Sequence, residues 1–142
     1  MNEKKKSRTI VDLLVLIAGI VMTAGAATFL KPCGPQEDGS WMTCHWAGQA
    51  VLGVSVLICV LALICLILSD AKVKVGLSIG IIGASALNAL LPGFLIQTCM
   101  MESMRCNSVM RPGIMVASAV VAALALVNII VSAVRSRKGA GQ

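Results

Sequence analysis

Four of the six cysteines in this 142-residue chain lie in two polar segments, and they are the residues best suited to chemistry. Cys33 and Cys44 belong to the first segment, and Cys99 and Cys106 belong to the second. In both segments the second cysteine sits in a shared pattern, Met42-Thr43-Cys44-His45 and Met104-Arg105-Cys106-Asn107. Cysteines exposed to an oxidising compartment form disulfides, so we expect these four to be paired.

Four cysteines allow three pairings, and the repeated pattern makes pairing within each segment the simplest, although bonds between segments also fit. In the first interpretation the disulfides only staple the loops. In the second they carry out thiol–disulfide exchange. His45 beside Cys44 and Arg105 beside Cys106 would favour exchange, because a positive neighbour promotes the reactive thiolate.

Soft-metal binding is a third interpretation of the same segments. Cys44, His45 and the nearby methionines offer ligands suited to Cu(I), the methionines being Met42, Met100, Met101, Met104 and Met110. Thiolate ligation and disulfide formation exclude one another, and no recognised metal-binding spacing is present. The single histidine excludes a bis-histidine haem within one chain. We therefore expect no metal and no cofactor.

The composition identifies the elements that must position these residues. Hydrophobic residues make up 58% of the chain, charged residues only 13%, and the mean hydropathy is +0.92. Soluble domains carry about 25% charged residues, so lipid is the expected solvent. A helix needs about 20 apolar residues to cross a bilayer. The charge-free stretches predict spans near 9–30, 47–68, 75–97 and 112–134, with outer loops near 31–46 and 98–111.

These spans predict an all-α membrane protein in which residues 1–142 form a single membrane domain, a bundle of four transmembrane helices. The matching cysteine segments indicate two helix–loop–helix repeats, although the shared pattern is short enough for convergence. Two cysteine pairs on a four-helix bundle resemble the architecture of the disulfide-generating quinone reductases, including the vitamin K epoxide reductase family. Those enzymes carry a C-x-x-C pair, which this chain lacks.

The basic residues indicate the orientation. Nine of the twelve lysines and arginines fall on one side of the proposed spans, which predicts a multi-pass cell-membrane protein with both termini in the cytoplasm. The net charge of +6 then needs no nucleic-acid partner. The first span resembles a signal peptide, but its apolar run reaches Leu30 and is long enough to span, so we expect it to be retained.

Polar residues within the spans have mainly structural interpretations. We expect Asp12 to act as a helix cap or to pair with Lys6 or Arg8, although small multidrug exporters use an acid in their first helix. Asn88 and Asn128 are expected to form hydrogen bonds between helices. Cys59 and Cys65 lie about 120° apart around one helix, so we expect them to behave as small apolar residues.

Small residues dominate the third span. Gly76 and Gly80 form a GxxxG element, which predicts close helix packing in the bundle or, alternatively, a dimer face. A homo-oligomer is therefore compatible with the sequence.

The four spans and three short motifs resemble a family of small prokaryotic membrane proteins, the domain of unknown function 4418. The motifs are Lys31-Pro32-Cys33, Met42-Thr43-Cys44-His45-Trp46 and Met104-Arg105-Cys106. The resemblance implies a prokaryotic cell membrane and no established activity. With no complete catalytic motif, we expect a non-catalytic component that presents its outer loops to a membrane or envelope partner such as a transporter complex. The alternatives are a membrane thiol–disulfide oxidoreductase and, after it, copper binding or small-molecule transport.

Overall fold

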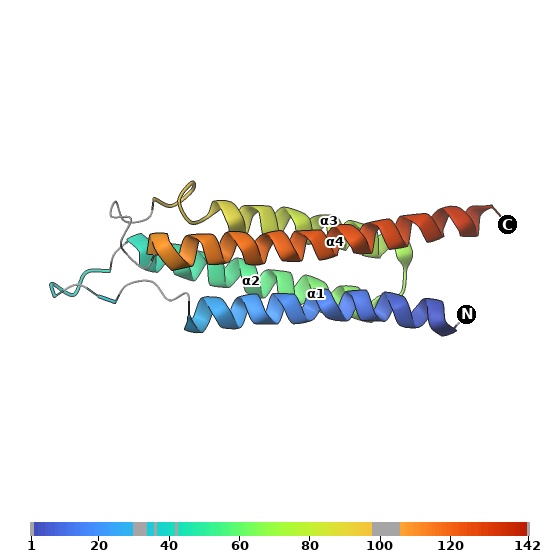
Figure 1. Ribbon diagram of the computed structural model, residues 1–142, viewed down its shortest axis with the longest axis horizontal. Coiled ribbons are helices and arrows are strands. Elements are labelled where there is room, and N and C mark those ends of the chain that lie inside the picture. Colours follow the sequence, from blue (N-terminus) through green and yellow to red (C-terminus); the bar gives the residue numbers. More distant parts are fainter. Residues whose placement is uncertain (1, 30–33, 36, 42, 98–105, 142) are drawn as a thin grey trace.

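The computed structural model describes residues 2–29, 34–35, 37–41, 43–97 and 106–141. These residues form four long α-helices, α1 Asn2–Thr28, α2 Thr43–Ile67, α3 Ala71–Leu90 and α4 Arg111–Ala140, and a π-helix, η1 Cys106–Met110, that leads into α4. Helices that follow one another pack side by side and α4 returns beside α1, which gives an up-down-up-down bundle (Figure 1). The predicted all-α four-helix architecture is confirmed.

The two ends of the bundle differ in what they carry. Both chain termini and the short link between α2 and α3 lie at one end, which we call the tail end (Figure 1). The last residues of α1 and α3 and the first residues of α2 and α4 lie at the opposite end, which we call the loop end (Figure 1).

Each helix buries one narrow seam of residues. In α3 the buried residues are Lys74, Ser78, Ile81, Ser85 and Asn88, so the spacing alternates between four and three. The seams of the other helices also advance by threes and fours. A mean repeat of 3.5 residues is the pattern of left-handed coiled coils and four-helix bundles.

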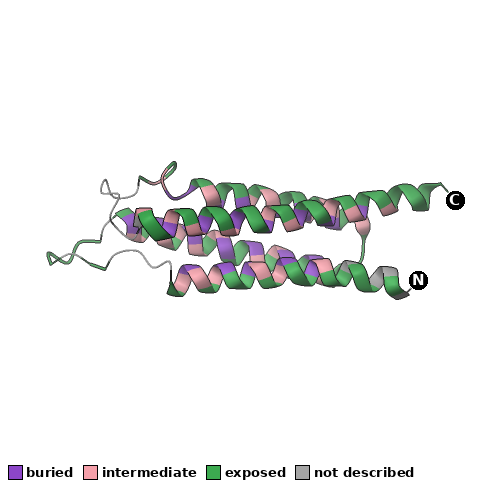
Figure 2. Ribbon diagram, in the orientation of Figure 1, coloured by how far each residue is buried: buried purple, intermediate pink, exposed green. Residues whose placement is uncertain are grey.

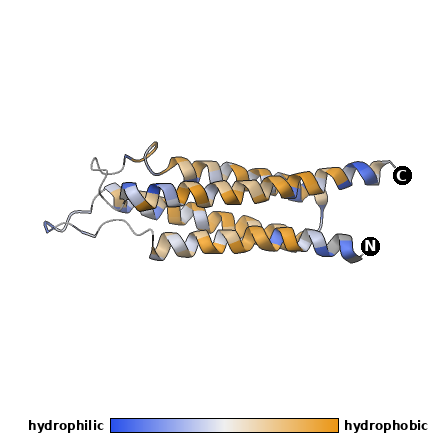
Figure 3. Cartoon of the chain, in the orientation of Figure 1, coloured by the Kyte–Doolittle hydropathy of each residue, from blue (hydrophilic) through white to orange (hydrophobic). Residues whose placement is uncertain are grey.

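The outer surface of the bundle is apolar rather than polar. Val21 is 65% exposed, and Ile79 and Ile130 are each 58% exposed. Exposed faces in Figure 2 coincide with apolar residues in Figure 3 along most of the helices. All four helices are long and apolar enough to cross a membrane. A surface of this kind is stable in lipid and not in water, so the chain is a multi-pass membrane protein.

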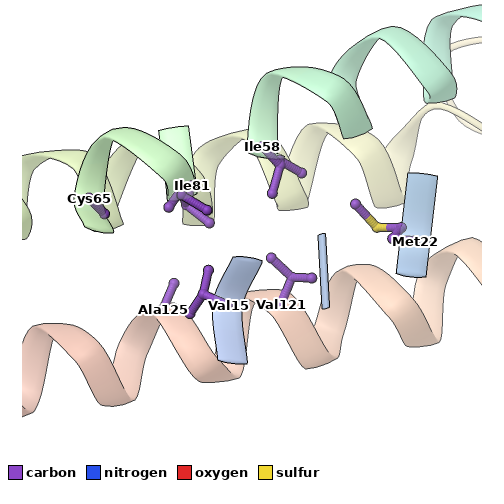
Figure 4. Close-up of a cluster of buried hydrophobic side chains, with 8 residues drawn as sticks. Val15, Met22, Ile58, Cys65, Ile81, Val121 and Ala125 are labelled. Atoms are coloured by element: carbon purple, nitrogen blue, oxygen red, sulfur yellow. The ribbon is translucent and has the colours of Figure 1, made fainter. Parts of the chain in front are cut away.

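The interior contains two apolar clusters. The central cluster comprises Val15, Met22, Ile58, Ala62, Cys65, Ile81, Val121 and Ala125. Figure 4 shows its side chains from all four helices pointing toward one another. The loop-end cluster comprises Ala26, Val51, Leu91, Met110 and Ile114. Apolar packing therefore extends from the middle of the bundle to the loop end.

Helix α3 is shorter than the span predicted over 75–97, because it ends at Leu90. Pro92 cannot continue a helix, and Gly93 adopts a positive φ of 101° that favours glycine. The Gly93 N–H then donates to the Ile96 carbonyl at 3.0 Å, which closes a turn. The helix therefore ends before the predicted limit at residue 97.

Candidate functional site

The tail half of the bundle contains a buried charged cluster formed by Asp12, Lys74 and Asn128, which we call the charged cluster. Asp12 of α1 is 1% exposed. Its Oδ2 accepts a hydrogen bond from Lys74 Nζ of α3 in a buried ion pair. Its Oδ1 accepts a hydrogen bond from Asn128 Nδ2 of α4 at 2.7 Å. Three helices are thus joined at one carboxylate.

Seam periodicity explains why these three residues meet. Asp12 lies three residues before buried Val15, and Lys74 lies four before buried Ser78, so both continue the inward-facing row of their helices. Asp12 therefore lies inside α1 rather than capping it and pairs with Lys74, not with Lys6, while the Arg8 side chain lies outside the described part of the chain. The predicted third span begins at residue 75 and leaves Lys74 at the membrane surface, but its position in the seam places its side chain inside the bundle.

Burial makes this pair energetically important. Ionisable groups inside a membrane bundle are costly unless they are paired and hydrogen-bonded. Here the ammonium group neutralises the carboxylate, and the Asn128 amide donates to the second oxygen. The thiol of Cys65 lies within electrostatic range of both Asp12 and Lys74, so α2 also contributes a side chain near the cluster.

A second polar group lies nearer the loop end. Asn88 Nδ2 donates to Ser55 Oγ at 3.4 Å and to Met22 Sδ at 3.5 Å, linking α3 to α2 and α1. Ser118 Oγ of α4 also approaches Met22 Sδ, at 4.0 Å. The predicted interhelical hydrogen bonds of Asn88 and Asn128 are confirmed.

Three buried polar atoms of the seam lack a partner within the described residues: Ser85 Oγ, Asn88 Oδ1 and Ser132 Oγ. Buried polar groups in proteins are almost always hydrogen-bonded, to water or to a ligand where no protein group is available. These atoms therefore mark places inside the bundle where a small polar molecule would be stabilised.

Most of the residues predicted to form a site in the loops lie outside the described residues, namely Cys33, Met42, Cys99, Met104 and Arg105. Cys106 is the first residue of η1, and nothing is described of its side chain. The predicted disulfides, their pairing and the soft-metal site therefore stay predictions. Among the described residues, no group of three or more His, Cys, Asp or Glu side chains could hold a metal ion.

The predicted boundary near residue 47 placed Cys44 and His45 in the first outer loop. In the structure both residues belong to the first turn of α2, which begins at Thr43. The Cys44 side chain is fully buried, whereas Trp46 is 63% exposed. The His45 ring lies 4.1 Å from the Trp41 ring and meets Trp46 edge-on at 5.7 Å. The helix therefore turns Cys44 inward and groups the three aromatic rings at the outer surface of the loop end.

The GxxxG element faces away from the bundle. Gly76 and Gly80 are exposed. A methyl group added at Gly76 would meet no atom within 4 Å, and one at Gly80 would meet only Leu61, at 3.9 Å. The predicted close packing within the bundle is therefore wrong for Gly76, and the alternative of a dimer face stays a prediction.

Fold, apolar surface and buried charged cluster together define a small four-span helical membrane protein. Residues 15–131 match the model of the family described as a domain of unknown function (DUF4418), and the chain belongs to this family. The resemblance inferred from the loop motifs is thereby confirmed. No curated protein and no solved structure matches the chain significantly.

Proposed function

We propose that this protein is a non-catalytic membrane component that presents its loop end to a second membrane or envelope protein, such as a transporter complex. The first outer loop is the observation that carries the proposal, because its described part extends beyond the ends of α1 and α2 (Figure 1). Glu37 and Asp38 are exposed there, and Trp41 is 51% exposed. Polar and aromatic side chains placed beyond the membrane-embedded helices are available to a protein partner.

The charged cluster supports a scaffold role for the bundle. Both carboxylate oxygens of Asp12 have partners within the chain, Lys74 and Asn128. A buried polar group with one set of partners can specify helix register, and here it would keep α1, α3 and α4 in one arrangement. A bundle with a fixed register keeps its loops in a constant position. Small-molecule transport would instead require Asp12 to exchange these partners for a substrate or a proton.

The same proposal places the tail end in the cytoplasm, because most basic residues of the chain lie at that end. Reporter fusions test this orientation. We expect fusions after Lys72 and Lys138 to report the cytoplasmic side, and fusions after Asp38 and Ser103 to report the opposite side. A signal from the opposite side at Lys72 would contradict the orientation.

Thiol–disulfide exchange is the alternative, and the environment of Cys44 bears on it. A thiolate that attacks a substrate disulfide has to be reachable by that substrate. Because Cys44 is fully buried against the bundle, its environment supports a structural staple rather than an exchanging thiol.

Site-specific photo-crosslinking in native membranes tests the partner proposal. A photoreactive residue at Asp38 should give a reproducible adduct with one other protein, and a residue at Ser136 near the tail end serves as the matched control. The charge reversal Glu37→Lys should lower the yield at position 38, since it changes the presented surface without touching the bundle. Adducts formed only with lipid, or the same adduct at both positions, would refute the proposal.

A further inference from the structure

A groove of about 400 Å³ opens between α3 and α4 at the tail end. The groove exists because most of the side chains that line it are small. These lining residues are Ala71, Val75, Ser132, Ala133 and Ser136. Lys72 of α3 and Arg137 of α4 also line it, and both are exposed. None of the described residues that line the groove is acidic. The groove therefore has a positive charge and a volume typical of small-ligand sites.

The N-terminus of α3 adds to this positive character. Ala71 is the first residue of the helix, and Asp70 before it makes no side-chain capping hydrogen bond. The backbone N–H groups of a first helical turn have no partners within their helix, and the helix dipole makes this end positive. Because Ala71 and Lys72 line the groove, this anion-attracting end of the helix borders it.

Ser132 provides an independent indication of a ligand. It is 1% exposed, its Oγ has no hydrogen-bond partner within the described residues, and it lines the groove. A buried hydroxyl without a partner is energetically unfavourable. Because the Oγ itself is inaccessible to solvent, a rotation of the Ser132 side chain would bring the hydroxyl to a ligand oxygen in the groove, which would then accept its hydrogen bond.

We propose that this groove binds the phosphate of an anionic phospholipid headgroup. The phosphate would lie between Lys72 and Arg137, near the first turn of α3, and would accept a hydrogen bond from Ser132. Basic pockets between transmembrane helices recognise acidic headgroups in this way. A lipid fits better than free phosphate, because the groove lies where the apolar, lipid-facing surface of α3 and α4 gives way to the basic tail end. This assignment does not depend on the proposed role of the loop end.

Native mass spectrometry of the full chain in detergent, titrated with phosphatidylglycerol, tests the site. The variant Lys72→Gln/Arg137→Gln should weaken binding of the first lipid about 30-fold. This factor corresponds to a loss of about 1 kcal/mol of binding free energy for each basic residue. The matched control Lys6→Gln/Lys138→Gln removes the same charge at residues that do not line the groove, and it should change this affinity little. An equal loss in both variants would show diffuse attraction to anionic lipid and would overturn the proposal.

Two further measurements by the same titration distinguish a phospholipid headgroup from other ligands. Ser132→Ala keeps every charge and should weaken the first lipid about tenfold, because it removes one hydrogen bond to a charged group. Phosphatidylcholine should bind weakly, and inorganic phosphate at millimolar concentration should not displace bound phosphatidylglycerol. Equal binding of phosphatidylcholine would overturn the proposal. Displacement by inorganic phosphate would reassign the groove to free phosphate and would overturn the lipid assignment.

Discussion

The two ends of the bundle are held together by different forces, although the same four helices form both. In the tail half, Asp12, Lys74 and Asn128 join three helices through an ion pair and a hydrogen bond. At the loop end, side chains such as Val51 and Ile114 meet in an apolar cluster. In a bilayer, apolar contacts compete with equally apolar lipid tails, so packing alone distinguishes poorly between alternative helix arrangements. The comparison indicates that the charged cluster of the tail half contributes most to specifying the arrangement. The Asn88–Ser55 hydrogen bond nearer the loop end adds to it, and the apolar cluster contributes close contacts.

Breaking the ion pair should have the largest effect. Lys74→Ala leaves the Asp12 carboxylate buried and unpaired, and we expect a loss of about 3–5 kcal/mol in the free energy of unfolding. Unfolding of the full chain in mixed micelles, titrated with a denaturing detergent, measures this loss. The matched control is Lys72→Ala, which removes an exposed lysine two residues away and should have little effect.

The double variant Asp12→Leu/Lys74→Met separates charge from packing. Replacing a buried ion pair by apolar residues of similar volume is often neutral or stabilising. This variant should therefore recover much of the stability lost by Lys74→Ala, less the cost of leaving the buried Asn128 amide without its acceptor. A native stability for Lys74→Ala alone would contradict the view that the tail half depends on charge pairing.

Loss of a predicted loop-end disulfide should have the next largest effect on stability. Removal of a native disulfide typically costs about 2–5 kcal/mol, so Cys44→Ser should lower stability and protein abundance if the loop cysteines are stapled. Acid quenching of cells, followed by a mass-tagged maleimide, counts free thiols in the unmodified protein. The staple interpretation predicts labelling of Cys59 and Cys65 alone, and only after denaturation.

Other labelling patterns would change the interpretation of the loop end. Partial labelling that responds to quinone supply, together with a stable but inactive Cys44→Ser variant, would favour thiol–disulfide exchange. Four fully reduced loop cysteines would exclude both interpretations and would favour a soft-metal site built from Cys44, His45 and the loop methionines.

The fold could be predicted from the sequence because lipid imposes the same requirement on every residue of a span. Charge-free stretches of sufficient length therefore located all four helices, although Pro92 and Gly93 end α3 before the predicted limit at residue 97. The charged cluster was missed because its ion pair joins residues 62 positions apart, and no local rule connects Asp12 to Lys74. Continuing the alternation of three and four from the apolar seam would have placed both residues inside.

A conservative truncation in the loop-end cluster should have a smaller effect on stability than Lys74→Ala or Cys44→Ser. Ile114 is fully buried in the loop-end cluster, so Ile114→Val should cost about 0.5–1.5 kcal/mol in the unfolding free energy. Ile130 is 58% exposed on the outer surface, and Ile130→Val is the matched control with little expected effect. Equal losses in the two variants, measured by the same micelle titration, would show that the loop-end cluster contributes no specific packing.

Cys65 lies where the two kinds of interaction meet, and its truncation should have the smallest effect. It belongs to the central apolar cluster, yet its thiol is within electrostatic range of Asp12 and Lys74. If the thiol acts as a small apolar group, Cys65→Ala should cost on the order of 1 kcal/mol, and Cys59→Ala should cost no more because Cys59 is only partly buried.

Both losses are to be measured in the background of Asp12→Leu/Lys74→Met as well as in the native chain. An apolar role requires the same cost in both backgrounds, since the contacts of Cys65 with the central cluster do not depend on charge. A cost that disappears when the ion pair is replaced would instead show that Cys65 stabilises the charged cluster, and would extend that cluster to the fourth helix.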